Sequence, residues 1–208
     1  MHLKIKMPSI SSDTKFQALH EHYKDTFLNI KESIKLRDKL VALVLLVLVL
    51  VVLYTFWPAD AITAFSQITA QKIGIAISVD GSFLGSIIWF ALLATVVRYT
   101  QVVVYIERQY AYIHHLEEEL HKNYDSEIVF TREGKSYLNK YPIFSDWICL
   151  LYTTIFPLVL IAVVLSKIIN EWISSACIFS LPLLLNTTLA ICVLVSVTLY
   201  MRFMHKQK

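Results

Sequence analysis

Cysteine and glycine are scarce in this chain, and each shortage excludes a class of protein. The three cysteines all lie in apolar runs and none has a Cys-x-x-Cys neighbour, so we expect neither a disulfide framework nor a structural metal site. With four glycines, the chain has no glycine-rich loop that would bind a phosphate group. No spacing typical of a catalytic triad or of a histidine metal site occurs either. The sequence therefore predicts that the protein is not an enzyme and has no cofactor and no bound metal.

Charged residues are also few, and apolar residues are correspondingly abundant. Charged residues make up 17% and apolar residues 56% of the 208 residues. Soluble domains average about 25% charged and about 45–50% apolar residues. Because the excess is concentrated in long runs, it indicates a membrane protein. The net charge of +3 is no sign of nucleic-acid binding by itself. The first run begins only at Leu40, behind a charged segment, so we expect a retained anchor rather than a signal peptide.

Four apolar segments are long enough to cross a membrane as helices. They are residues 40–57, 82–106, 147–166 and a stretch within 173–201. We expect a tight loop at residues 167–171 between the last two. No aspartate or glutamate falls inside these four segments, which argues against a proton-coupled carrier. The predicted fold class is all-α, an integral membrane helical bundle of four transmembrane helices with cytoplasmic helical extensions.

The segments divide the chain into five parts. Residues 1–39 form a cytoplasmic amphipathic helix, 40–106 the first two transmembrane helices with an external interfacial segment, 107–146 a cytoplasmic helix extension and loop, 147–201 the third and fourth transmembrane helices, and 202–208 a basic cytoplasmic tail. The interfacial segment, residues 59–80, is too interrupted to span a membrane, and a short extended piece at 75–79 is compatible with its alternation. A small hairpin and a helical turn are both compatible with the loop at 125–142.

The distribution of lysine and arginine predicts the orientation. Sixteen of the nineteen lie in the parts assigned to the cytoplasm, and Lys72 and Lys167 are assigned to the outside. This bias fits the positive-inside rule, whereas the opposite orientation does not. We therefore expect a multipass protein of the cell inner membrane with both termini in the cytoplasm.

The chain is organised around one long helix predicted at residues 82–124. No proline interrupts it, and no glycine follows Gly85, so it runs for roughly 40 residues or about 60 Å. Its first half is apolar apart from Arg98, and its second half is charged. One face of this helix carries small and polar residues, which are the candidate pore-lining residues Ala91, Ala94, Arg98, Gln101 and Tyr105. Either Arg98 faces a pore or cavity, or it reaches the lipid headgroups from a membrane boundary near Thr100.

Two apolar stripes lie outside the membrane segments. One follows Asp13, the expected N-cap of the first helix, and the other has a heptad-like spacing in the second half of the long helix. The candidate oligomerisation residues in these stripes are Phe16, Leu19, Tyr23, Val102, Ile106, Ile113, Leu116 and Leu120. Packing within the chain itself is one interpretation, and a partner or the membrane surface is the other. Because the stripes are too large to leave in water, we expect a homo-oligomer in which these helices pack together.

Two further groups of polar residues lie in the predicted cytoplasmic parts. Arg132, Lys135, Tyr137 and Lys140 form a small basic and aromatic cluster. Such a mixture is able to stack bases and pair phosphates, although interfacial anchoring is the alternative. The run of glutamates at 117–119 is interpreted as a solvated helix face.

The layout resembles that of small transmembrane effectors of bacterial anti-phage defence systems of the cyclic-oligonucleotide, retron or Hailong type. The resemblance rests on the amphipathic helix at residues 16–34 that leads into the span at 40–57, and on the long helix that passes through Arg98 to Leu120. It implies an oligomeric pore that depolarises or permeabilises the membrane when a cytoplasmic part binds a nucleotide, a single-stranded nucleic acid or the enzyme that makes it. Two other classes stay open, namely a non-conducting scaffold or regulatory subunit and a component of a lipid or small-molecule transporter.

Overall fold

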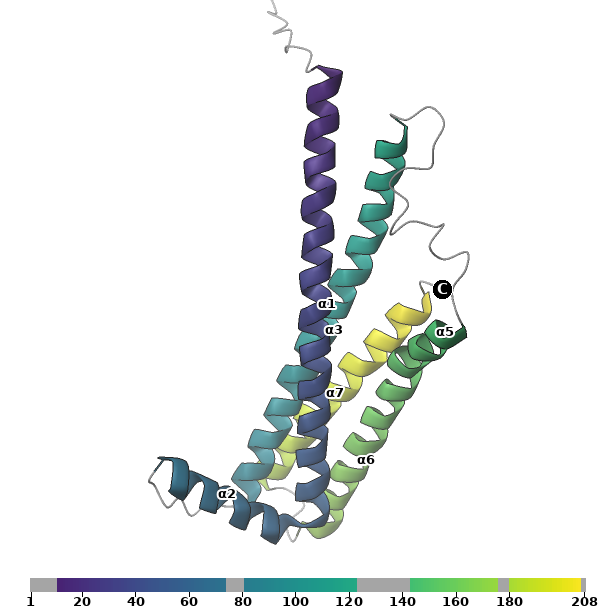
Figure 1. Cartoon of the computed structure of the whole chain (residues 1–208). Coiled ribbons are helices and arrows are strands. Elements are labelled where there is room, and N and C mark those ends of the chain that lie inside the picture. Colours follow the sequence, from purple (N-terminus) through teal and green to yellow (C-terminus); the bar gives the residue numbers. More distant parts are fainter. Residues whose placement is uncertain (1–10, 74–80, 123–142, 176–179, 207–208) are drawn as a thin grey trace, which may run out of the picture. The chain divides into compact units, whose positions relative to one another are not determined.

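The computed structural model describes residues 11–73, 81–122, 143–175 and 180–206. These residues form helices and contain no strand (Figure 1). The elements are α1 (Ser12–Phe56), α2 (Pro58–Ile73), α3 (Gly81–His121), α5 (Ile143–Leu150), the π-helical turn η1 (Leu151–Ile155), α6 (Phe156–Ser174) and α7 (Leu181–Lys206). Four helical segments are long and apolar enough to cross a membrane, which confirms an all-helical, multipass membrane protein.

The chain separates into two compact units. Residues 1–35 and 105–142 form the first, which we call the helix-pair unit, and residues 36–104 and 143–208 form the second, the membrane unit. The long helices α1 and α3 each contribute to both units. The predicted amphipathic helix and the first span are therefore one continuous helix, and the single long helix expected at 82–124 is confirmed as α3 in its described part.

In the helix-pair unit, the predicted apolar stripe of α3 is buried within the chain, and that of α1 is half-buried apart from Ile30. Ile30 of α1 is buried, as are Ile113, Leu116 and Leu120 of α3. Polar contacts join the same two helices, because the hydroxyl of Tyr23 donates a hydrogen bond to Glu117. The interpretation that these stripes pack within the chain is thus the one the structure supports, and the stripes no longer require an oligomer.

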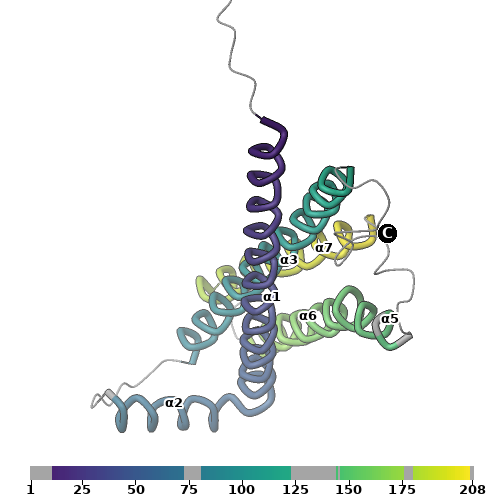
Figure 2. The backbone as a smooth tube through the Cα atoms, turned by 45° about the horizontal axis from the view of Figure 1, so that its top comes forward, coloured from purple at the N-terminus to yellow at the C-terminus, as the bar shows by residue number. Residues whose placement is uncertain are grey.

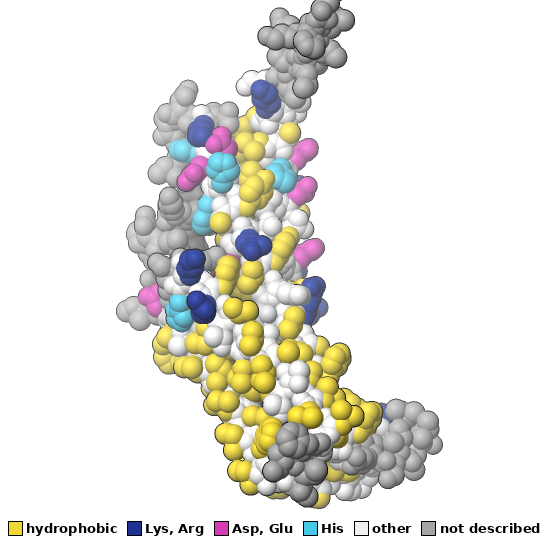
Figure 3. Space-filling model, turned by 180° about the vertical axis from the view of Figure 1, so that it is seen from behind, with side chains coloured by type: hydrophobic (Ala, Val, Ile, Leu, Met, Phe, Trp, Pro, Cys, Tyr) yellow, Lys and Arg dark blue, Asp and Glu magenta, His cyan; other side chains and the backbone are white. Residues whose placement is uncertain are grey.

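The membrane unit has a core of small and branched apolar side chains and an apolar outer surface. Val44, Leu92, Val164 and Val193 come from the four long helices and are fully buried. The face seen in Figure 3 shows a surface of the membrane unit that is covered largely by hydrophobic side chains. An apolar exterior around an apolar core is the pattern expected of a protein surrounded by lipid. Helices α6 and α7 pack side by side, and α2 turns away from the end of α1 (Figure 2).

Proline positions explain two local features. Pro58 begins α2 directly after α1 has ended, at a position where a missing backbone N–H costs little. Pro157 lies in the first turn of α6, just after η1, where the backbone N–H of Phe156 bonds to the oxygen of Leu151. Because Pro157 has no N–H to give to the preceding turn, a local change to π-helical bonding keeps the helix continuous through it.

Two boundary predictions need correction. The expected loop at 167–171 is the last part of α6, which continues to Ser174, and α7 begins only at Leu181. The N-cap of α1 is Ser11, whose hydroxyl accepts a hydrogen bond from the N–H of Thr14, and Asp13 lies in the first turn. The interfacial segment forms the 16-residue helix α2, which agrees with the prediction that it does not span the membrane. The possible extended piece at 75–79 and the loop at 125–142 lie outside the described residues.

Candidate functional site

A buried ion pair on α6 is the centre of the most polar region of the membrane unit. The Nζ atom of Lys167 lies 2.6 Å from Oε1 of Glu171, one helical turn further along. The Lys167 side chain is 3% exposed and that of Glu171 17%. Both residues follow a long apolar run of α6, so the helix carries these charges into the bundle and not into a solvated loop. Helix α6 thus extends beyond the span predicted at 147–166 and includes a lysine and a glutamate that the sequence assigned to a loop.

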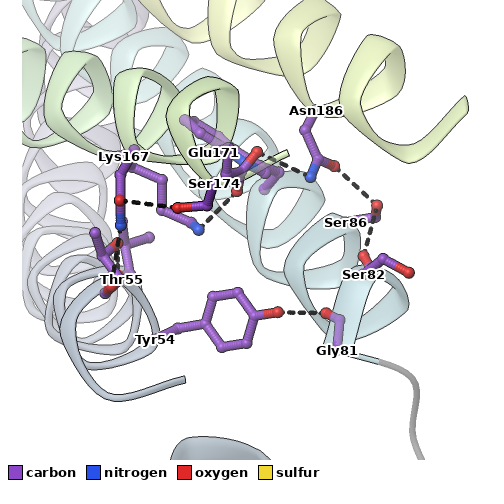
Figure 4. A network of polar contacts seen from close by, with 12 residues as sticks. Tyr54, Thr55, Gly81, Ser82, Ser86, Lys167, Glu171, Ser174 and Asn186 are labelled. Carbon is purple, nitrogen blue, oxygen red and sulfur yellow. Dashed lines mark hydrogen bonds and ion pairs between the residues drawn. The ribbon is translucent and has the colours of Figure 1, made fainter. Parts of the chain in front are cut away.

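Side chains from two other helices complete the hydrogen bonds of the Glu171 carboxylate (Figure 4). The indole N–H of Trp89 on α3 donates to Oε1 at 3.0 Å, and the amide of Asn186 on α7 donates to Oε2 at 3.1 Å. The hydroxyl of Ser86 on α3 donates to the amide oxygen of Asn186 at 2.8 Å. We call Lys167, Glu171, Asn186, Ser86 and Trp89 the polar network.

The first helix, α1, joins the polar network through two weaker contacts. The ammonium group of Lys167 lies 4.6 Å from the ring centroid of Tyr54, within cation–π distance. The Tyr54 hydroxyl donates in turn to the backbone oxygen of Gly81 (Figure 4). Asn170 of α6 donates to the backbone oxygen of Thr55. Gly85 leaves room for Tyr54, because an added Cβ there would lie 3.3 Å from the Tyr54 ring, and at Gly81 an added Cβ would lie 3.0 Å from Cδ1 of Ile62. Both glycines thus serve close contacts within the chain.

The charges and hydrogen-bonding groups of the polar network compensate one another within the chain. A buried charge is costly unless it is paired and hydrogen-bonded, so both charges need compensation. Lys167 neutralises Glu171, and Trp89 and Asn186 donate to the two carboxylate oxygens. A small hollow of about 160 Å³ adjoins Glu171 and Asn186 and is lined partly by serines. The arrangement joins α1, α3, α6 and α7 at one level of the membrane unit.

A second polar layer lies at the opposite end of the membrane unit. The rings of Tyr99 and Tyr200 are 5.8 Å apart, and the Tyr200 hydroxyl donates to the backbone oxygen of Tyr152. The guanidinium of Arg37 lies 5.9 Å from the Tyr152 ring. Along α3 and α7, this tyrosine cluster is about 20 Å from the polar network by helical rise. Tyrosines and arginines at one level are typical of a membrane–water boundary.

The tyrosine cluster shows where Arg98, the central residue of the predicted pore face, lies along the helical bundle. Arg98 is adjacent to Tyr99 and therefore lies at the level of Arg37, and Arg202 follows Tyr200 by two residues. Arg98 is exposed, and its side chain has no hydrogen bond or ion pair among the residues that the structure describes. Arg98 therefore lies at the level of the tyrosine cluster, where an arginine is able either to reach the lipid headgroups or to face the mouth of a path.

The other candidate pore-lining residues divide into two groups. Ala94, Gln101 and Tyr105 are exposed on α3 together with Arg98, whereas Ala91 is half-buried and lines an apolar pocket against α1 and α2. By helical periodicity the same exposed face continues through Phe90 and Ile87, which are 65% and 44% exposed. The face is thus polar near the tyrosine cluster and apolar near the polar network.

The candidate oligomerisation residues mostly pack inside the chain. Val102, Ile106, Ile113, Leu116 and Leu120 are buried, and Phe16, Leu19 and Tyr23 are half-buried. Glu117 corrects the interpretation of the glutamate run as a solvated face, since it is 4% exposed and accepts the hydrogen bond of Tyr23. The candidate ligand-sensing residues Arg132, Lys135, Tyr137 and Lys140 lie outside the described residues.

One exposed carboxylate of the helix-pair unit has a shifted pKa. The side chain of Lys122 donates a hydrogen bond to Glu119, and this bond together with the positive charge of Lys122 lowers the pKa of the Glu119 carboxyl. Because the side chains of Lys122 and Glu119 are 67% and 40% exposed, solvent screens the pair and it adds little to stability. A separate polar contact joins the two helices of this unit, because His22 of α1 makes a 2.8 Å hydrogen bond with Tyr112 of α3.

Sequence reasoning missed the polar network because it assigned Lys167 and Glu171 to a loop. Two signals were present: the four-residue spacing that pairs a lysine with a glutamate on one helical face, and Asn186 in the following apolar run.

Comparison with known proteins adds no further assignment. No protein-family model, no curated protein and no solved structure matches the chain.

Proposed function

We propose that the protein is an oligomeric membrane effector that conducts ions when its cytoplasmic part receives a signal. The observation that carries this proposal is the exposed polar face of α3 formed by Ala94, Arg98 and Gln101. Lys167 and Glu171 neutralise each other inside the chain, whereas Arg98 is exposed and has no such partner among the described residues. A symmetric assembly with this face inward places one Arg98 per subunit around the mouth of a path.

The remainder of the same face supplies a closed gate. Ala94 is small and allows neighbouring helices to approach closely. Beyond it, Phe90 and Ile87 project from the same face and would narrow the path with apolar side chains. Apolar constrictions block ion flow by excluding water until the helices move apart. By the resemblance to defence effectors, the signal is a nucleotide, a single-stranded nucleic acid or the enzyme that makes it, and the result is depolarisation of the inner membrane.

Arg98→Ala tests the proposed path. We expect the wild-type protein, reconstituted in planar bilayers, to prefer anions, because a ring of arginines attracts them. The substitution should reduce the anion-to-cation permeability ratio severalfold, as measured by reversal potentials in a chloride gradient. Arg98→Lys should preserve the preference, since a pore mouth needs the charge more than the guanidinium group.

Arg202→Ala is the matched control, because Arg202 is exposed on α7 close to the tyrosine cluster but does not lie on the α3 face. It should leave selectivity unchanged. If both substitutions have the same effect, or if the wild-type protein does not conduct, the arginines only anchor the helices at the headgroups and the proposed path is wrong.

A tag on α2 tests the proposed orientation. With both termini in the cytoplasm, a reporter after His205 should be active on the cytoplasmic side and a tag at Gln71 should be accessible from outside. The charge bias favours this orientation more strongly once Lys167 is excluded from the external residues, because it is buried in α6. The opposite orientation would be indicated if an impermeant reagent labelled a tag after His205 but did not label a tag at Gln71.

A non-conducting scaffold is the second candidate. It is favoured by the burial of Ile113, Leu116 and Leu120 within one chain, which lets the helix-pair unit fold without an oligomer. Its exposed outer faces would then be free to bind a cytoplasmic partner. A wild-type protein that remains silent in bilayers, under every candidate signal, would favour the scaffold over the pore.

A further inference from the structure

An apolar pocket of about 550 Å³ lies between α1, α2 and α3 in the membrane unit. Leu50 and Leu53 line it from α1, Ala64 and Phe65 from α2, and Leu84 from α3. Its volume is in the range of ligand-binding pockets, about 300–1,000 Å³. The pocket is at the end of the spans that is remote from the tyrosine cluster, where α2 begins.

Water is a poor occupant of this pocket. A buried water molecule needs two to four polar partners, and only Tyr54, Trp57 and Asp60 carry polar side-chain atoms in the lining. The Tyr54 hydroxyl already donates to the backbone oxygen of Gly81. The remaining lining side chains are apolar, so an occupant that is itself hydrocarbon is favoured.

A spanning helix of a second copy is too large for the same space. An α-helix with its side chains is about 10–12 Å across, so about 550 Å³ holds only about one turn of it. A lipid acyl chain is slender and is supplied by the surrounding bilayer. The pocket adjoins α2, an amphipathic helix of 16 residues that is too short to cross the membrane. An acyl chain in the pocket therefore has its headgroup near the start of α2.

Asp60 determines which headgroup fits there. It lies in the first turn of α2, is exposed, and is the only charged residue among those that line the pocket. A carboxylate at this position attracts a primary ammonium group and repels an anionic headgroup. We propose that the pocket binds one acyl chain of an aminophospholipid, with the lipid ammonium group paired to Asp60.

Native mass spectrometry of the full chain tests this proposal. Protein in detergent is incubated with phosphatidylethanolamine or with phosphatidylglycerol of the same chain length. We expect the wild type to retain one phosphatidylethanolamine and to bind it about tenfold more tightly than phosphatidylglycerol. Ala64→Trp, which fills the pocket, should abolish retention of either lipid, and Asp60→Asn should still retain a lipid but lose the preference.

Ala162→Trp is the control, because Ala162 is exposed on α6 and does not line the pocket. It should bind lipid as the wild type does. The proposal is overturned if Ala64→Trp retains lipid, if Ala162→Trp loses it equally, or if Asp60→Asn keeps the wild-type preference.

Brominated lipid provides a readout that does not depend on the folding of the Ala64→Trp variant. Trp57 lines the pocket, so one equivalent of phosphatidylethanolamine with brominated acyl chains should quench the fluorescence of the wild type. Trp57→Phe should remove most of this quenching at the same ratio. Equal quenching in both proteins would place the lipid elsewhere and contradict the site.

Discussion

Replacing Glu171 by alanine is expected to destabilise the membrane unit by about 3–5 kcal/mol, because it leaves Lys167 as an uncompensated buried charge. Trp89 and Asn186 lose their hydrogen-bond acceptor in the same variant. Thermal unfolding of the detergent-solubilised protein, followed by intrinsic fluorescence, should show a midpoint many degrees below that of the wild type. This is the largest single-residue effect that we expect in the chain.

The double variant Lys167→Met with Glu171→Gln provides the matched control. It removes both charges, while glutamine keeps an amide oxygen that accepts from Trp89 or Asn186. Replacing a buried ion pair by uncharged side chains of similar size is often neutral, so the double variant should recover most of the stability that Glu171→Ala loses. An Asp38→Ala variant, which breaks the exposed pair with Arg37, should change the midpoint little. If Glu171→Ala were as mild as Asp38→Ala, the ion pair would not stabilise the bundle.

Leu120→Asp is expected to separate the two helices of the helix-pair unit. Leu120 is fully buried, and an aspartate there introduces an unpaired buried charge, at a cost of several kcal/mol. Hydrogen exchange of backbone amides should therefore accelerate in residues 105–121 of α3 and residues 12–35 of α1. Amides of the membrane unit, such as those of α7, should exchange as in the wild type.

Ala111→Asp is the control for this variant, because Ala111 is exposed on the same stretch of α3. Its exchange should match that of the wild type. The mass of the detergent-solubilised particle distinguishes separation of the two helices from dissociation of an oligomer that the apolar stripe of α3 would hold together. Dissociation into smaller particles without loss of amide protection in Leu120→Asp would restore the oligomerisation role of these residues and contradict packing within the chain.

The helical architecture was predictable because length, hydropathy and the lack of helix breakers act locally along the chain. The absence of glycine and proline after Gly85 was enough to predict α3 as one helix, and Pro58 was enough to place the end of α1. The amphipathic stripes were also correctly found. A stripe identifies a buried face but does not identify what covers it, so the packing of α1 against α3 within one chain was left as one of two interpretations.

The polar network was not predictable for a different physical reason. Charged residues next to an apolar run usually mark a membrane boundary, since an isolated charge avoids hydrocarbon. Lys167 and Glu171 are an exception because they neutralise each other one turn apart, and because Trp89 and Asn186 approach from other helices. The level of Arg98 was uncertain for a related reason, because it depends on the neighbours of Tyr99 on α6 and α7 and not on the sequence of α3.

The composition of the polar network also affects how the protein is assembled during synthesis. Lys167 and Glu171 lie on the same helix, and Asn186 lies on the next, so the last two helices carry most of the compensation for their own charges. This pair of helices is therefore able to enter the bilayer together as a nearly neutral hairpin. Ser86 and Trp89 are synthesised much earlier and obtain their partners on α7 and α6 only when that hairpin arrives. Docking of the final hairpin is thus the step that gives the indole N–H of Trp89 its acceptor.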